Sequence, residues 1–323
     1  MRGEDTAVSP RGWFPGSDCT SSCIPEPNAL PSVGPPRRAL RVVAMAVVLA
    51  ATAVVVPLFP SLGALMARAV IRAAGVVVPM RPEPVAPGSL VVANHSSWLD
   101  VVALTALGSS RAPVRMLAKR EVGTWPFLGW LARRTRTLFV DRGTLRTLPS
   151  TVAEMTERLR AGESIGVFPE ATTWCLPARG RFRHAPFQAA IDAEARVAPV
   201  TLWFTFADGS PTTAAAFLGE DSFMSSLRRV LRTKGLRMHV IASEPFPAVG
   251  DRRGLAVRAE TAVVHEALTG LVAGLRERAA VRAEPPAVPG VLIPNRRLID
   301  RNHAPAGGTA AVGPRPRRVL TPH

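Results

Sequence analysis

The sequence predicts an α/β protein, in which helices flank a mixed, mostly parallel sheet and an N-terminal membrane helix or helical hairpin precedes it. From about Ser89, short runs rich in branched apolar residues alternate with amphipathic helical segments, which is typical of an α/β domain. A long apolar stretch without charge stands before this region, at 42–60. Several of the short apolar runs end in polar residues, which indicates a functional site at the strand ends.

The apolar stretch at 42–60 is long enough to form a membrane helix. At about 1.5 Å per residue it measures roughly 28 Å, close to the roughly 30 Å hydrocarbon thickness of a bilayer. Pro57 interrupts only its last turn, and a buried helix of a soluble protein is the alternative. The next apolar segment, 62–78, carries Arg68 and Arg72 on one side, as in a helix at the membrane surface with arginines reaching lipid phosphates. The two segments form either a spanning helix with a surface helix, or a hairpin in one leaflet.

The alternation after Ser89 gives a specific set of elements. Strands are predicted at 90–93, 114–118, 137–140, 165–168, 197–203 and 237–242. Helices are predicted at 100–107, 128–134, 145–160, 185–195, 223–233 and 255–278. The chain then divides into a disordered leader at 1–36, membrane-anchoring helices at 37–80, the α/β domain at 81–280 and a disordered basic tail at 281–323.

Charge and cysteine content limit the classes of partner. The chain has 40 Lys and Arg against 24 Asp and Glu, a formal charge of +16, which suits an anionic membrane, an acidic substrate or nucleic acid. No recognition-helix pattern or RNA-binding aromatic box supports nucleic acid. Cys19, Cys23 and Cys175 are scattered, so they predict thiols rather than a disulfide framework or a four-ligand zinc site, and no metal is expected.

The strongest chemical signal is Asn94-His95-Ser96-Ser97-Trp98-Leu99-Asp100, which follows the predicted strand at 90–93. The shift from polar to apolar residues after Ser97 predicts a helix start, so Asp100 lies one turn into that helix. A carboxylate there can accept the Nδ1 proton of His95 and leave Nε2 to take a proton from a substrate hydroxyl. In isolation, capping of the loop explains the same pair as well as catalysis does.

Two further strand ends carry polar candidates. Arg142, in Phe139-Val140-Asp141-Arg142, can bind a phosphate or carboxylate, or pair with Asp141 or a helix end. Glu170 and Thr172 lie in Phe168-Pro169-Glu170-Ala171-Thr172, where Pro169 ends the strand. Glu170 either positions a substrate hydroxyl or is a solvated loop acid.

Together these segments resemble the glycerolphosphate/lysophosphatidate acyltransferase family over about residues 40–250. The family pattern Asn-His-x4-Asp matches Asn94–Asp100, and Phe-(Ile/Val)-Asp-Arg matches Phe139–Arg142. Phe-Pro-Glu-Gly-Thr matches Phe168–Thr172 except that Ala171 replaces Gly, and Ala disfavours the positive φ or close approach that Gly allows. Ala198-Pro199-Val200 approximates the fourth element, Val-Pro-Val.

The resemblance implies a general base, His95, that Asp100 orients, with Arg142, Glu170 and Thr172 at the acceptor headgroup. It implies transfer of a fatty acyl chain from acyl-CoA or acyl carrier protein to a lysophospholipid hydroxyl, most simply 1-acyl-glycerol 3-phosphate to give phosphatidate, without a further cofactor. Lyso-ornithine lipid is the alternative acceptor, and a catalytically inactive membrane-binding relative is the alternative outside the enzyme class. The implied location is the cell membrane, with the domain facing the cytoplasm.

Overall fold

The computed structural model describes residues 16–80, 82–141, 145–175 and 179–283. Residues 1–282 form one compact unit, and residues 283–323 form a second. The predicted basic tail at 281–323 lies outside the described residues, apart from its first three, which end the last helix.

The core of the first unit is one sheet, whose strand order is β3-β2-β4-β1-β5-β6, with β7 also paired to β5. The strands are β1 (Ser89–Ala93), β2 (Val114–Lys119), β3 (Leu138–Val140), β4 (Ser164–Val167), β5 (Arg196–Thr205), β6 (Arg237–Ala242) and β7 (Phe246–Pro247). The pairs among β1 to β5 are parallel, whereas β6 and β7 run antiparallel to β5. The predicted mixed, mostly parallel sheet is therefore confirmed, and only the two-residue β7 was not predicted.

Eight α-helices surround this sheet among the described residues. They are α1 (Pro35–Leu58), α2 (Gly63–Ala73), α3 (Trp98–Ala106), α4 (Pro126–Arg134), α5 (Leu148–Arg160), α6 (Ala185–Asp192), α7 (Phe223–Arg232) and α8 (Arg252–Ala283). Short 3-10 turns occur at η1 (Ser21–Cys23), η2 (Pro60–Leu62), η3 (Arg120–Thr124) and η4 (Leu145–Thr147). All the predicted helices are present, with ends within about five residues of the predicted ones, except that α1 begins at Pro35 and the predicted apolar stretch at residue 42.

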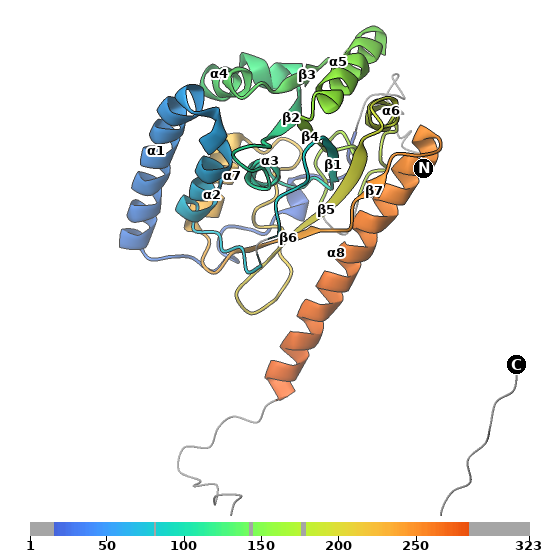
Figure 1. Cartoon of the computed structure of the whole chain (residues 1–323). Helices are drawn as coiled ribbons and strands as arrows, with labels where there is room; N and C mark the ends of the chain where they lie inside the picture. Colours follow the sequence, from blue (N-terminus) through green and yellow to red (C-terminus); the bar gives the residue numbers. More distant parts are fainter. Residues whose placement is uncertain (1–15, 81, 142–144, 176–178, 284–323) are drawn as a thin grey trace, which may run out of the picture. The chain divides into compact units, whose positions relative to one another are not determined.

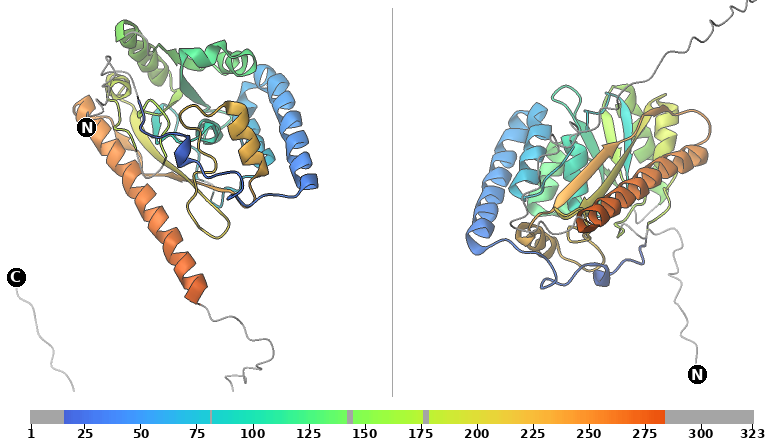
Figure 2. Two further views of the ribbon diagram at one scale, coloured as in Figure 1. Left: turned by 180° about the vertical axis from the view of Figure 1, so that it is seen from behind. Right: turned by 90° about the horizontal axis from the view of Figure 1, so that it is seen from below.

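The two faces of the sheet are covered by different helices (Figures 1 and 2). Successive residues of a strand point to opposite faces, and β1 shows this clearly. Val91 and Ala93 pack in a core cluster with residues of α1, α2, α3 and α7. Leu90 and Val92 pack in a second cluster with residues of α5, α6 and α8. The central strand is thus buried on both faces, as expected for a parallel strand between helical layers.

The helix α1 is the one helix in the described part of the chain that is long and apolar enough to cross a membrane, with a mean hydropathy of 2.5. It lies beside α2, and the short turn η2 joins them as a hairpin (Figure 1). Met45, Thr52 and Val56 are buried against the domain. The other side of α1 exposes large apolar side chains, at Leu40, Val43, Val47, Val54 and Leu58.

The arginines of this hairpin do not all reach outward as the sequence predicted. The guanidinium of Arg68 donates hydrogen bonds to the carbonyl oxygen of Ala106, at the end of α3. Arg41 donates to the carbonyl oxygens of Leu231 and Thr233, at the end of α7. These two arginines therefore attach the hairpin to the domain, while Arg72 is exposed.

Part of the N-terminal segment that was predicted to be a disordered leader contacts the domain. The Val33 amide donates to the Arg232 carbonyl oxygen at 2.9 Å, and the Lys234 amide donates to the Pro31 carbonyl oxygen at 2.7 Å. Cys19 is only 4% exposed. The expectation of disorder at 1–36 therefore differs from the structure over residues 16–34, and residues 1–15 lie outside the described part.

Candidate active site

The candidate site lies where β1 ends, in the loop of residues 94–97 before α3. Ser97 caps α3: its side chain accepts a hydrogen bond from the Leu99 amide at 3.2 Å. Asp100 is the third residue of the helix, and its side chain accepts the Ser97 amide in return. This reciprocal capping box places the Asp100 carboxylate under the loop. The predicted helix start, with Asp100 one turn into the helix, is confirmed.

Asp100 is fully buried and holds the loop together through one oxygen. Its Oδ2 accepts the amide hydrogens of Ser96 at 2.6 Å and Ser97 at 2.7 Å. The Nδ1 of His95 lies 3.2 Å from the same oxygen. When Nδ1 carries the proton and donates to Asp100, the unprotonated nitrogen of the ring is Nε2. With 19% of its side chain exposed, His95 can reach a bound substrate while Asp100 stays inaccessible.

Two neighbours that the sequence interpretation did not single out fix the position of His95. The side-chain amide of Asn94 donates to the Leu202 carbonyl oxygen at 2.8 Å and accepts the Leu202 amide hydrogen at 2.9 Å, which ties the loop to β5. The ring of Phe168 stacks on the imidazole, with centroids 4.0 Å apart and planes at 13°. Both residues lie inside the motifs already quoted, so the motifs pointed to them, but their contacts could not be predicted.

Glu170 lies beneath the same loop and not on its open side. It is 4% exposed, and its Oε2 accepts the main-chain amide hydrogen of His95 at 2.7 Å. Burial raises the pKa of Glu170 to about 8, although the hydrogen bond from the His95 amide acts in the opposite direction. Near neutral pH the carboxyl is therefore largely protonated, and its contacts with the backbone amides of His95 and Gly180 hold the two loops in position.

At position 171, where the family motif has glycine, the backbone has the left-handed conformation that glycine favours. Ala171 has a φ of +62°, in the left-handed region. Its amide donates to the Phe168 carbonyl oxygen at 3.0 Å and closes the turn. Further along, the amide of Trp174 donates to the carbonyl oxygen of His95 at 2.8 Å. The Ala replacement has thus left the turn in place at the cost of backbone strain.

The structure brings together three of the five predicted site residues. His95, Asp100 and Glu170 are connected by hydrogen bonds around one loop. Thr172 is half-buried in the loop that follows Glu170. Arg142 lies outside the described residues, so its predicted role is untested.

Comparisons with known proteins point to one family. The sequence model described as Acyltransferase matches residues 67–203, a range that contains His95, Asp100 and Glu170. The lyso-ornithine lipid O-acyltransferase of Pseudomonas aeruginosa is 38% identical over 194 residues, which are 59% of this chain and 72% of that protein. The 1-acyl-sn-glycerol-3-phosphate acyltransferase of Neisseria meningitidis is 34% identical over 161 residues, which are 50% of this chain and 61% of that protein.

Among solved structures, the 1-acyl-sn-glycerophosphate acyltransferase of Thermotoga maritima matches 72% of this chain and 97% of its own. The sequence identity is 18% and the TM-score is 0.45. The fold described above rests on the strand order and packing of the present chain.

Proposed function

This chain belongs to the acyltransferase family, and on that premise we propose that it transfers a fatty acyl chain to the free hydroxyl of a lysolipid. The observation that carries the proposal is the contact of His95 Nδ1 with the buried Asp100 carboxylate, because it leaves Nε2 as a base. The same observation argues against an inactive relative, since both members of the pair are in place.

The proposed reaction needs no covalent enzyme intermediate. His95 Nε2 takes the proton of the acceptor hydroxyl while that oxygen attacks the carbonyl carbon of a thioester, forming the ester C–O bond. The C–S bond then breaks, and the leaving thiolate recovers the proton from His95. The nearby hydroxyl residues Ser96 and Ser97 are buried, which supports direct attack by the acceptor. Acyl-CoA and acyl carrier protein are the donors we propose.

For the acceptor, we propose 1-acyl-glycerol 3-phosphate, with phosphatidate as product. Arg142 would bind the phosphate and Thr172 would line the headgroup site, while Glu170 supports the loop from below. A second candidate acceptor, lyso-ornithine lipid, is favoured by the relative that shares 38% identity with this chain.

We also propose that the α1–α2 hairpin lies in the cytoplasmic leaflet of the cell membrane. Its support is the exposed apolar side of α1 together with the packing of its opposite side on the domain. Exposed Phe127 on α4 and Met224 on α7 extend the apolar surface, beside an aromatic group formed by Trp98, Trp125 and Phe223. Aromatic residues are favoured at the level of the lipid headgroups. The cytoplasmic side follows from the location of the proposed donors.

The test is acyl transfer by purified full-length protein in detergent micelles, with acyl-CoA and each lysolipid offered separately and together. Product masses distinguish phosphatidate from ornithine lipid, and the His95→Ala variant measures the background. We expect one acceptor to be used at least tenfold faster than the other. If neither acceptor yields product above the His95→Ala background, with acyl-CoA or with acyl carrier protein as donor, the proposed function is wrong.

A further inference from the structure

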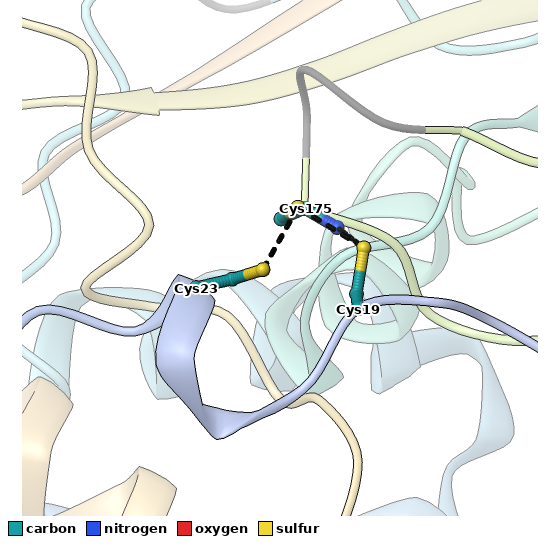
Figure 3. Close-up of side chains that lie close together, drawn as sticks. All are labelled: Cys19, Cys23 and Cys175. Carbon is teal, nitrogen blue, oxygen red and sulfur yellow. Dashed lines mark hydrogen bonds between the residues drawn. The ribbon is translucent and has the colours of Figure 1, made fainter. Parts of the chain in front are cut away.

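The three cysteines of the chain, which the sequence interpretation treated as scattered thiols, lie together in the structure (Figure 3). The Sγ atoms of Cys19 and Cys175 are 3.0 Å apart, and those of Cys175 and Cys23 are 3.4 Å apart. All three sulfur atoms lie within 4.8 Å of one another. Two of them come from the N-terminal segment and the third from the loop that follows Glu170, so the cluster joins regions more than 150 residues apart in sequence.

The local backbone presents the two N-terminal sulfurs to the same point. Thr20 caps the 3-10 turn at Ser21–Cys23, and its side chain accepts the Ser22 amide hydrogen. The carbonyl oxygen of Cys23 accepts a hydrogen bond from Thr213 Oγ1 at 2.6 Å, which fixes the end of the turn to the domain. Three residues separate Cys19 from Cys23, a spacing found for paired thiolate ligands of zinc.

The distances between the sulfurs suit a shared ion better than a covalent bond. A disulfide requires about 2.05 Å, and both closest pairs are well beyond that length. Thiolates around a tetrahedral zinc ion, each at about 2.3 Å from the metal, stand about 3.8 Å apart. Both observed separations are closer to that value than to the length of a disulfide bond.

The cluster is buried on one side and open at Cys23, whose side chain is partly exposed. Cys19 and Cys175 are buried, and they pack with Ala216, Leu218 and Trp174. The amide of Cys175 points at Cys19 Sγ, at 3.1 Å. An amide hydrogen donated to sulfur stabilises the thiolate form, which is the form that binds metals.

We propose that Cys19, Cys23 and Cys175 bind one thiophilic metal ion, with zinc as the physiological candidate and water as a fourth ligand. Each coordinated thiol releases its proton to solvent when the ion binds. The ion would fasten the N-terminal segment to the loop that carries Glu170 and Trp174. Because the Trp174 amide donates to the His95 carbonyl oxygen, this fastening would stabilise the support of the catalytic loop. Cys175 lies within the residues 67–203 that match the family model, whereas Cys19 and Cys23 precede them.

The first test counts metal on the full-length, reduced protein in detergent micelles, without any assay of acyl transfer. The chain is titrated with Co²⁺, whose thiolate charge-transfer absorption reports sulfur ligands, and zinc is then added to displace it. We expect saturation at about one ion per chain. We expect the affinity for the metal ion to fall at least about 100-fold in each of the three variants Cys19→Ser, Cys23→Ser and Cys175→Ser. Loss of a residue that only supports a metal ligand already lowers metal affinity by about 10- to 100-fold. Ser21→Ala, an exposed position in the same turn, is the matched control and should bind as the native chain does.

The melting temperature of the native chain, measured with and without zinc, tests the proposal even if the cysteine variants do not fold. We expect zinc to raise Tm and a chelator to reverse that rise in the native chain and in Ser21→Ala. Absence of the charge-transfer absorption in a folded native chain would overturn the proposal. So would an intact mass lower by two hydrogens in protein isolated without reductant from its native host, because a disulfide would then be the function of the cluster. Both readouts are independent of which lysolipid is acylated.

Discussion

The two loops that meet at His95 are built in different ways. In the loop after β1, residues 94–97, the helix start is shaped by local bonds: Asp100 accepts from Ser96 and Ser97, and Ser97 caps α3. The first part of this loop, Asn94 and His95, is bonded to β5 and to the second loop. The loop after β4, residues 168–175, depends on partners far along the chain. Trp174 donates to His95, and the sulfur of Cys175 contacts that of Cys19.

This difference suggests that the loop after β1 holds the catalytic residues, whereas the loop after β4 supports them. In the first loop, Asp100 accepts the amide hydrogens of Ser96 and Ser97, a pattern that a helix start favours locally. The second contains a buried carboxyl group and a strained residue, Glu170 and Ala171, which persist because the surrounding structure holds them. Changes in the first loop should therefore affect turnover most, and changes in the second should affect stability and its dependence on pH.

The largest effect is expected at the first loop. His95→Ala should lower kcat by about 10²–10⁴, because general base catalysis is typically worth that much, and it should leave the fold intact. Asp100→Asn should lower kcat as well, since an amide can donate to Nδ1 and favour the wrong tautomer. Initial rates with acyl-CoA and lysolipid check both variants. His265→Ala, at an exposed position on α8, is the control and should be fully active. A His95→Ala rate near that of the native enzyme would refute the mechanism.

The second loop should give the chain a stability that depends on pH. The pKa of Glu170 is raised from its ordinary 4.5 to about 8 in the folded protein. The folded state therefore holds this proton more tightly than the unfolded state, and its contribution is fully present below pH 4.5 and is lost as pH rises through about 8. The loss is on the order of a few kcal/mol. Glu170→Gln should flatten the fall of Tm between pH 5 and 8.5.

The control for this titration is Glu157→Gln, on the exposed side of α5. Its Tm profile should follow that of the native protein. A native profile without a fall over this range, or one that Glu170→Gln leaves unchanged, would show that Glu170 is not the buried acid responsible.

A smaller loss of stability is expected when the helix cap of the first loop is removed. Ser97→Ala should cost about 1 kcal/mol, the usual value of a serine N-cap, and it should also lower kcat because the cap positions Asp100. Ser222→Ala removes the corresponding cap of α7, where the side chain of Ser222 accepts the Ser225 amide hydrogen. It should cost a similar amount and leave kcat unchanged. Equal effects of the two variants on kcat would remove the distinction between the loops.

The smallest effect is a gain in stability at the second loop. Ala171→Gly relieves the positive φ, worth about 1–2 kcal/mol, but adds about 0.5–1 kcal/mol of chain entropy in the unfolded state. The net rise should lie between about 0 and 1.5 kcal/mol, at roughly 2–4 °C in Tm per kcal/mol for a domain of this size. Ala153→Gly, on the exposed side of α5, should instead lower Tm. A fall in Tm for Ala171→Gly would mean that the left-handed turn is not strained.

The same difference between the loops explains what the sequence could predict. The helix start that places Asp100 one turn after His95 is a local pattern that can be read from a few residues, and the resemblance to the family motif then implied the roles of the pair. The contact of Glu170 with the His95 amide depends on how β4 lies against β1, which no local pattern contains. The cysteine cluster was missed for the same reason, since its members approach only after the N-terminal segment has packed on the domain.

The way in which α1 is attached also bears on how substrate reaches the enzyme. The guanidinium of Arg41 fills the space beside Gly75, and a methyl group at position 75 would collide with it. The same guanidinium donates a hydrogen bond to the end of α7. A helix fixed in this way is part of the rigid body and not a tether. With α1 in the leaflet, as proposed, the catalytic histidine stays at one height above the lipid surface. Encounters with the acceptor then occur by lateral diffusion in two dimensions, so the rate should follow the mole fraction of lysolipid in the surface and not its bulk concentration.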